Sequence, residues 1–532
     1  MESGEGRFSY SSSAVRRPGP PPAGDGDTRP ELADVGRLAR RLLRQVVGAA
    51  RAEENSIWHL LAGHLGPGVA TLPVASGYWP QYDQVNVQAG LEAWLADPGR
   101  SHEIAGLTRF HHTMFGLADL TQPGHGRFDH GLGLGSVSTD MLPSGPGEAT
   151  RPCVQCALYL VTEPVGPLVA LLRGPDEHGG QESVTVEVAC ADRERGQQVV
   201  DEIRRLAVEH NVFRGHVLAF GGDVFGGYAF GRVRRPLLSF LDRPSVGRDQ
   251  IILPPEVLDG IERQVLGVAR HAGQLLASGQ HLKRGILLHG APGTGKTHTV
   301  RYLLSELDGV TVLILSGGAL RLIGEACSVA RTLRPSLIVI EDVDLIAEER
   351  EIMMGQHPLL FQLLNEMDGL GADLDVTFLL TTNRADLLEP ALAQRPGRVD
   401  HAALLPLPDA DARRRLLRLY QGNLELDLAD PDAVITRTEG VTASFLKELL
   451  RRAALRAAGE PGPAAPGGST ATGPALRVTD AHLTAALDEL LDTSNQLTRA
   501  LLGASGRGQR APLGADAVIP DPGRRPPRRP RP

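Results

Sequence analysis

The stretch "GILLHGAPGTGKTHTV", Gly285 to Val300, decides the fold. A short apolar run typical of a buried strand leads into G-x-x-x-x-G-K-[ST], and a helical segment follows. Glycines let the backbone curl so that successive N–H groups face phosphate oxygens, and the following helix adds its positive end. A glycine-rich turn with a chance lysine is the alternative, but the flanking strand and helix favour a phosphate-binding loop.

This loop predicts a site for ATP or GTP. Lys296 would reach the β- and γ-phosphates, and the Thr297 hydroxyl would hold Mg²⁺. The residues predicted to line the nucleotide are Gly290, Ala291, Pro292, Gly293, Thr294, Gly295, Lys296, Thr297 and His298.

A second stretch, "SLIVIEDVD", Ser336 to Asp344, has the pattern of a buried strand that ends in acids. Its apolar run leads directly into Glu341 and Asp342, which would emerge at the exposed end of the strand. Nucleotide hydrolases usually carry Asp before Glu here, and this sequence reverses them. Strand and helix patterns alternate from about Ile251 to Pro408, which predicts a parallel sheet with helices on its faces.

Three further stretches resemble the AAA ATPase family. "FLLTTNRADLLEPALAQRPGRVD", residues 378–400, is similar to the second region of homology of that family, and "ALRLIGEACSVARTLRPSLIVIEDVD", residues 319–344, looks like its pore-loop segment and second nucleotide strand. "TEGVTASFLKELLRRAALRA" resembles its helical lid. The resemblance covers about residues 250 to 455 and leaves the N-terminal half and both tails outside. It implies a soluble, bacterial-type member that binds Mg-ATP, hydrolyses ATP and forms a homo-oligomeric ring, a hexamer in the family.

The resemblance also implies roles for single residues. Asn383 takes the sensor position that orients water, while Arg395 and Arg398 match the arginine fingers that act on the neighbouring subunit's ATP. Glu341 takes the metal-side position and Asp342 the water-activating one. Asp342 is one methylene short, which reduces its reach by ~1.5 Å, so we expect hydrolysis with Asp342 as base; an ATP-binding switch with little turnover is the alternative.

The pore-loop resemblance contains a departure. Leu322 stands where protein-threading members carry an aromatic residue, followed by Ile323 and Gly324. Leucine offers less rigid contact area than Tyr or Phe, so threading of a polypeptide is compatible with the sequence but not required by it. In the lid, Ala443 and Ser444 stand where many distant relatives place a sensing arginine.

The composition changes along the chain suggest six regions. We expect a helical N-terminal region at 31–145, a small α/β domain at 146–235, the α/β ATPase part at 236–408 and a helical lid at 409–502. The lid is interrupted by a Gly/Pro-rich insertion at 459–474. Residues 1–30 and the basic tail 503–532 are low in complexity and are expected to be disordered.

Composition and missing motifs argue against several other classes of protein: nucleic-acid-binding, membrane and zinc-dependent ones. The net charge of −8 gives no overall case for nucleic acid or an anionic membrane, and no apolar run suffices for a membrane span. H-E-x-x-H does not occur, which argues against a zinc protease of the kind fused to some AAA proteins. "CVQC" (Cys153 to Cys156) lacks a second pair, and His102, His111, His112, His125 and His130 are better explained as surface or loop histidines than as zinc ligands. A cytoplasmic protein is expected.

Three functions remain open from the sequence. The first is a ring ATPase that remodels a protein client recognised by residues 31–235. The second is an ATP-controlled binding or scaffold protein with little turnover. The third is a DNA-associated AAA+ protein that uses the basic tail, against which the acidic balance of the whole chain argues.

Overall fold

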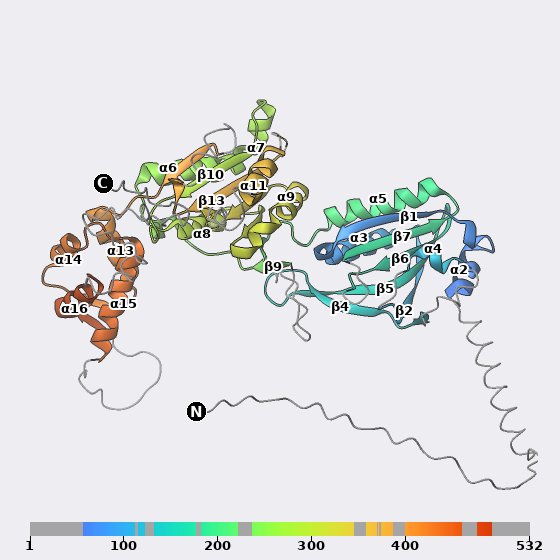
Figure 1. Ribbon diagram of the computed structural model, residues 1–532, viewed down its shortest axis with the longest axis horizontal. Helices are drawn as coiled ribbons and strands as arrows, with labels where there is room; N and C mark the ends of the chain where they lie inside the picture. Colours follow the sequence, from blue (N-terminus) through green and yellow to red (C-terminus); the bar gives the residue numbers. More distant parts are fainter. Residues whose placement is uncertain are drawn as a thin grey trace, which may run out of the picture.

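Two seven-stranded sheets and a helical subdomain make up the part of the chain that the computed structural model describes. The described residues are 57–111, 115–122, 132–176, 182–221, 237–344, 358–369, 371, 374–386, 399–459 and 476–491. The first part of the region expected at 31–145, up to residue 56, and the basic tail lie outside them. In Figure 1 the N-terminal sheet lies on the right, the second sheet in the middle and the helical subdomain on the left.

The second sheet has the predicted α/β architecture. Its strand order is β14-β10-β13-β12-β11-β8-β9, and every neighbouring pair is parallel except β8 and β9. Its strands are β8 (Val217–Phe220), β9 (Leu238–Leu241), β10 (Arg284–His289), β11 (Thr311–Leu315), β12 (Ser336–Ile340), β13 (Val376–Thr382) and β14 (His401–Leu404). Their continuous apolar runs reflect burial on both faces, as expected for parallel strands under helices.

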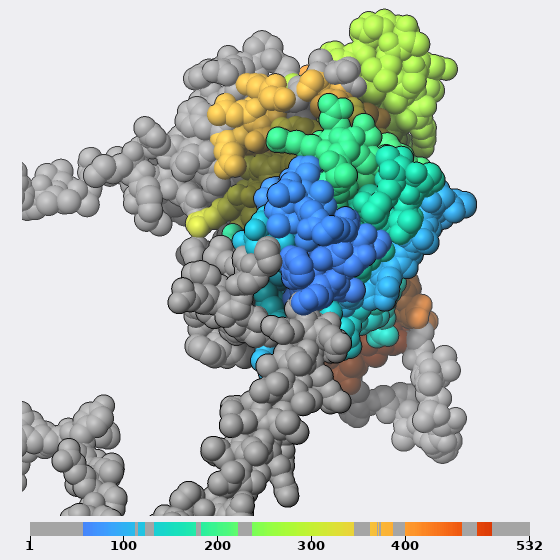
Figure 2. All heavy atoms as spheres, turned by 90° about the vertical axis from the view of Figure 1, so that its right-hand side faces the viewer, coloured from blue at the N-terminus to red at the C-terminus, as the bar shows by residue number. Residues whose placement is uncertain are grey.

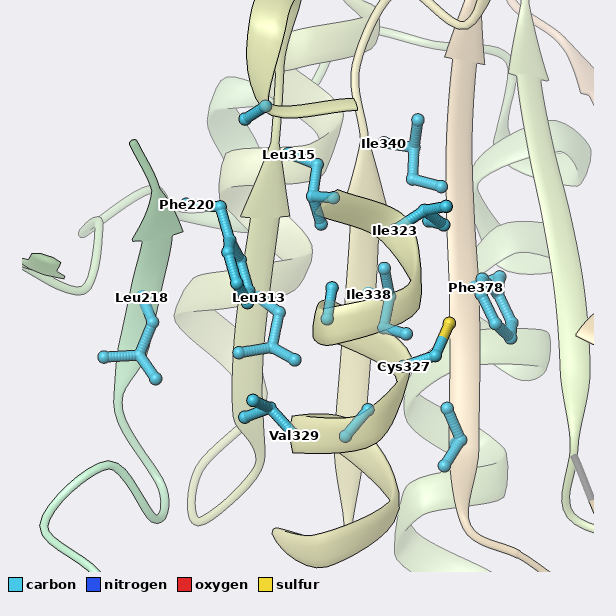
Figure 3. Packing of buried hydrophobic residues seen from close by; sticks show 14 of the residues in the cluster. Leu218, Phe220, Leu313, Leu315, Ile323, Cys327, Val329, Ile338, Ile340 and Phe378 are labelled. Carbon is cyan, nitrogen blue, oxygen red and sulfur yellow. The ribbon is translucent and has the colours of Figure 1, made fainter. Parts of the chain in front are cut away.

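Helices cover both faces of this sheet. On one face lie α6 (Pro255–Glu262) and α8 (Lys296–Glu306), with the short π-helical turn η5 (Arg263–Gly267) leading to α7 (Val268–Ala277). On the other face lie α9 (Ile323–Thr332) and α11 (Pro358–Gly369), α9 following the 3₁₀ turn η6 (Gly317–Leu322). Figure 3 shows Ile323, Cys327 and Val329 of α9 packed over apolar side chains of β8, β11, β12 and β13.

The N-terminal sheet is antiparallel, in the order β1-β7-β6-β5-β2-β3, with β4 paired to β5. Its strands are β1 (Val74–Pro80), β2 (Ser101–Thr108), β3 (Gly133–Gly135), β4 (Ser138–Pro143), β5 (Thr150–Glu163), β6 (Gly166–Arg173) and β7 (Ser183–Cys190). Helices α3 (Gln84–Leu95) and α5 (Arg193–Glu209) pack on one face. On the other lie α2 (Ile57–Leu65) and α4 (Leu117–Leu120), with the 3₁₀ turns η1 (Val69–Thr71) and η2 (Gln81–Asp83) nearby in the chain.

The expectation that residues 31–145 are helical is therefore wrong for their described part, which contains β1 to β4. Burial alternates along β1, but its buried positions include Gly77 and its exposed ones include Tyr78, and most of β2 is exposed, so apolar and polar residue types do not alternate in either sequence. Pairing with β7 and β5 makes them strands. The small α/β domain is thus part of a sheet that begins before residue 146.

The expected boundary at residues 235 and 236 also differs from the structure. Strand β8 follows α5 of the N-terminal unit but pairs in parallel with β11 of the second sheet, and β9 returns antiparallel to it. Arg243, just after β9, donates from its guanidinium to carbonyl oxygens of Leu304 (2.7 Å), Gly215 (2.9 Å), Val310 (3.2 Å) and Leu307. The chain that follows α5 is therefore part of the second sheet through β8 and β9, and Arg243 binds it to the end of α8. It is not a free linker between two domains.

The C-terminal helices form a separate apolar core. They are α13 (Ala410–Gln421), α14 (Pro431–Arg437), α15 (Ala443–Gly459) and α16 (Asp480–Leu491), with a short parallel pair, β15 (Glu425–Asp427) and β16 (Arg477–Thr479). The predicted insertion begins inside α15, whose last residue is Gly459, and its remaining residues lie outside the described part.

The two cysteines of "CVQC" lie in different apolar cores. Cys153 lies in the core shared with α9, Cys156 in the core beneath α2, and Cys190 in the core beneath α3 and α5. Burial raises the pKa of the Cys153 and Cys156 thiols to about 12. Within the described ranges no three His, Cys, Asp or Glu side chains group as metal ligands; His112, His125 and His130 lie outside those ranges. None of the helices in those ranges has the length and apolar character needed to cross a membrane.

Candidate active site

The predicted phosphate loop connects β10 to α8, as the sequence required. Gly290, Gly293 and Gly295 have φ values of +149°, +80° and +102°, a region that side chains rarely adopt. A Cβ at Gly290 would lie 2.5 Å from the Leu405 carbonyl oxygen. The Thr294 hydroxyl donates to the Ala291 carbonyl at 2.9 Å. The glycines therefore permit a tight loop whose amides lead into the first turn of α8.

Lys296 is the buried cation of this loop, with 7% of its surface exposed. Its Nζ donates to the carbonyl oxygens of Gly290 and Ala291 at 2.9 and 3.0 Å. Burial lowers the pKa of Lys296, and the carboxylates of Asp342 and Asp344 act in the opposite direction. The ammonium is thus held over the loop, on the side where the acids of β12 emerge.

Glu341 and Asp342 follow β12 directly, as predicted. Burial, then the neighbouring Asp342 charge, raises the pKa of Glu341, while Arg301 and a hydrogen bond with Thr297 lower it. That bond joins Thr297, which the phosphate loop predicts to hold Mg²⁺, to Glu341, to which the resemblance gives the metal-side position. Asp342 is the more exposed acid of the pair, which suits a group that must meet water.

Asn383, to which the resemblance gives the sensor position, lies beside Asp342: its Nδ2 donates to Asp342 Oδ1 at 3.4 Å. A third acid, Asp344, was not among the predicted site residues, although "EDVD" contains it. Asp344 is buried, accepts from the Thr382 hydroxyl at 2.9 Å and receives the Asn383 amide at 3.4 Å. These bonds fix the end of β13, which Asn383 follows. The sequence signal that could have identified Asp344 is the presence of an acid two residues after Asp342.

The helical subdomain reaches the phosphate loop through the start of α15. The Ser444 amide donates to the Gly293 carbonyl at 3.2 Å, and a Cβ at Gly293 would lie 2.9 Å from Ser444 Oγ and 3.0 Å from Thr442 Oγ1. A residue from the lid therefore touches the loop at the position where distant relatives place an arginine. His298 is half-buried, and burial lowers its pKa, while its hydrogen bond to the Gln250 backbone acts in the opposite direction.

The segment predicted as a pore loop is only partly exposed. Ile323 has 2% exposure and packs in the core as the first residue of α9, so its side chain cannot contact a polypeptide in this conformation. Leu322 ends η6 and is half-buried against the same core. A Cβ at Gly324 would lie 3.4 Å from Gln362 Nε2. Arg321 and Glu325 are the exposed residues of "RLIGE".

Arg395 and Arg398 lie outside the described residues, so the structure does not place the predicted arginine fingers.

The residues present fit a nucleotide with Mg²⁺. The loop supplies backbone amides, a helix start and one ammonium, which suit phosphate. The Thr297 hydroxyl and the carboxylates of Glu341 and Asp342 are oxygen donors, which Mg²⁺ prefers. Nothing larger than hydrogen fits at Gly290 or Gly293 without a clash.

Residues 286–407 match the family described as "ATPase family associated with various cellular activities (AAA)". The chain is similar to the ATP-dependent zinc metalloprotease FtsH of Nitrosococcus oceani, 36% identical over 209 residues, which cover 36% of this chain and 32% of the relative. The FtsH of Acidimicrobium ferrooxidans is 28% identical over 370 residues, 65% of this chain and 54% of the relative.

A human relative, ATPase family gene 2 protein homolog A, is 33% identical over 257 residues, 43% of this chain and 29% of that protein. The chain thus spans less than two thirds of each of these relatives. The matched residues run from β10 through β14 and contain the phosphate loop, both acids and Asn383. The chain therefore carries a domain of the AAA ATPase family.

Proposed function

We propose that this protein binds Mg-ATP between the phosphate loop and the acids after β12, and hydrolyses it. The observation that carries the proposal is the meeting of three elements. Lys296 donates to its own loop and interacts with the charges of Asp342 and Asp344, and Asn383, after the next strand, donates to Asp342. A cation, a carboxylate and an amide brought together at the carboxyl ends of parallel strands can bind phosphates and direct water at them.

In this site the chain's own residues divide the work. Lys296 and the loop amides would bind the phosphate oxygens, exchanging their present carbonyl contacts for the ligand. Asp342 would take the proton of the attacking water, and Asn383 would orient that water and the carboxylate. Thr297 and Glu341 would hold Mg²⁺, which neutralises charge on the phosphates when bound.

The finer proposal is a homo-oligomeric ring, with six subunits as the family expectation, that remodels a protein client. Arg395 and Arg398 would complete the neighbouring subunit's site, and such fingers contribute ~10³-fold or more to the rate. The N-terminal sheet would recognise the client or an adaptor. Leu322 packs against the same apolar cluster as Val85 and Cys153 of the N-terminal unit, which supports a connection between that unit and the second sheet.

The test is Mg²⁺-dependent ATP turnover as a function of protein concentration, for the parent, Lys296→Ala, Asp342→Asn and Arg395→Ala. We expect the specific activity of the parent to rise with concentration, because the finger comes from another subunit. Lys296→Ala should lose ATP binding, whereas Asp342→Asn should retain binding and lose turnover by ~10²-fold or more. Arg395→Ala should bind ATP normally and turn it over slowly at every concentration.

Two observations favour a second candidate, an ATP-controlled binding protein with little turnover. The base position holds the shorter acid, and its hydrogen bond from Asn383 is long at 3.4 Å. A parent that binds ATP, assembles with it and shows no turnover at any concentration would select this second function and refute the first.

A further inference from the structure

Asp342 has an unusual backbone. Its φ is +51°, and in the described part of the chain only one other non-glycine residue, Arg109, has a positive φ. Left-handed backbone is costly for an L-residue because Cβ approaches the following carbonyl, although Asp tolerates it better than most. Such a conformation persists only where the surrounding structure holds it.

Hydrogen bonds to Thr381 hold this conformation. Strands β12 and β13 pair regularly as far as Ile340 opposite Leu380. Beyond that pair, the Asp342 amide donates to the side-chain oxygen of Thr381 at 3.1 Å, and the Val343 amide donates to the Thr381 backbone carbonyl at 2.9 Å. One residue of β13 thus receives two successive amides of the turn.

Thr381 is itself firmly placed. It has 1% exposure, lies within β13 and is β-branched, so its side chain has little freedom of rotation. Glu341 is held on the other side, where its amide donates to the Leu315 carbonyl of β11 at 3.1 Å. The backbone therefore stays bonded to the sheet through Glu341 and turns away at Asp342. The contact that fixes this turn is Thr381.

We propose that Thr381 is a positioning residue for the reaction: its hydroxyl holds Asp342 in the left-handed turn, and this turn brings the shorter acid to its working position. The proposal rests on the proposed hydrolysis of ATP by this site. A left-handed residue directs its side chain differently from an extended one, so the backbone can offset the missing methylene. The reversed order of Glu341 and Asp342 is then a working arrangement rather than a defect.

The first test compares Thr381→Val, which removes the hydroxyl at nearly constant shape, with Thr381→Ser, which restores it. We expect Thr381→Val to lower kcat by ~10- to 100-fold, as misplacement of a catalytic group by about 1 Å does, with ATP binding changed by less than about twofold. Thr381→Ser should recover most of kcat. A Thr381→Val protein with parental kcat overturns the proposal.

Thr377→Val is the matched control. Thr377 lies four residues earlier on β13, is half-buried and pairs with Arg284 and Leu337, away from the acids. We expect this variant to keep kcat. If it loses as much kcat as Thr381→Val, the effect is a general one of valine in β13, and the proposal fails.

The second test is Asp342→Glu, which restores the acid length usual in this family. On a left-handed backbone set for aspartate, the longer side chain should overreach, so we expect kcat to fall. A gain in kcat for Asp342→Glu would show that the backbone does not offset the short side chain.

The third test does not depend on turnover. Crystal structures of the parent and of Thr381→Val give the φ of residue 342 directly. We expect residue 342 to remain left-handed in the parent and to leave that region in the variant; a left-handed Asp342 in Thr381→Val overturns the proposal. A parent that binds ATP without turnover would refute the proposed hydrolysis, while these two structures would still decide whether Thr381 sets the turn.

Discussion

Gly293 has both a backbone and a packing reason to be glycine. Its φ of +80° strains any side chain, and a Cβ would lie 2.9 Å from Ser444 Oγ of the lid. The Ser444 amide also donates to its carbonyl oxygen. At this residue the phosphate loop and the lid touch, so the shape of the loop and the position of the lid depend on each other.

We predict that Gly293→Ala weakens ATP binding by ~10-fold or more, because the methyl group pushes α15 away and strains the loop. Gly309→Ala is the matched control: Gly309 has a φ of +68°, but a Cβ there meets no atom within 4 Å. Both variants should lose about 1 kcal/mol of stability from the backbone. Binding measured by calorimetry should fall in Gly293→Ala alone, and equal affinities would contradict the role given to the lid contact.

At the scale of elements, helix α15 carries an ionic cluster as well as the contact with the loop. Glu448 accepts from Arg451 and Arg452 at 2.7 and 2.8 Å, and Arg452 continues to Glu489 of α16. Hydrogen bonds from Arg451, then Arg452, lower the pKa of Glu448 to about 2. The cluster ties the two long helices of the lid across their solvent-facing side.

We predict that Glu448→Gln destabilises the protein at pH 7 by about 1 kcal/mol, a value kept small by solvent screening. The folded pKa lies below the unfolded one, so the contribution is complete above about pH 4.5 and is lost as the pH falls toward about 2. Urea unfolding of parent and variant at pH 7, 5 and 4 should show the difference shrinking only at the lowest pH. Glu425→Gln, an exposed carboxylate of the same subdomain, serves as control; a pH-independent effect of Glu448→Gln would count against this account.

At the scale of the whole molecule, the N-terminal unit and the second sheet share an apolar core. Val85 of α3 and Cys153 of β5 lie in the same apolar cluster as Leu320 and Ile323. Burial, with the charges of Asp83 and Glu325, raises the pKa of Tyr82, so the turn before α3 lies near the first turn of α9. Figure 2 views the molecule from the side of the N-terminal unit, whose blue and green atoms lie in front, and in Figure 1 α9 lies on the side of the second sheet that faces this unit. A displacement of the N-terminal unit would therefore be felt, through this shared core, by the segment that resembles a pore loop.

We predict that Val85→Ala loosens the ATPase core, whereas Val87→Ala on the same helix does not. Val85 has 2% exposure in the shared core, and Val87 has 0% in the core of the N-terminal unit. Each substitution should cost about 2 kcal/mol locally. Hydrogen exchange in residues 317–332 should rise in Val85→Ala only. Equal protection of residues 317–332 in the two variants would contradict the role given to Val85 in the shared core.

The sequence by itself determined the parts whose chemistry is local. The phosphate loop, the strand before Glu341 and Asp342, and the strand before Asn383 were all predicted. Each is recognised from residues close together in the chain: the spacing of glycines in the loop and an apolar run of strand length in the other two. The family was also predicted, since its motifs follow one another in a fixed order.

Only the tertiary structure decided the rest. The strands β1 and β2 carry little apolar alternation, and they become strands because β7 and β5 offer them backbone partners. Strand β8 reads like any strand of the N-terminal unit, but it pairs with β11, a choice between two sheet edges that no local pattern encodes. The left-handed turn at Asp342 likewise depends on Thr381, 39 residues away. Long-range pairing and burial fix these features, and a chain read residue by residue contains no signal for them.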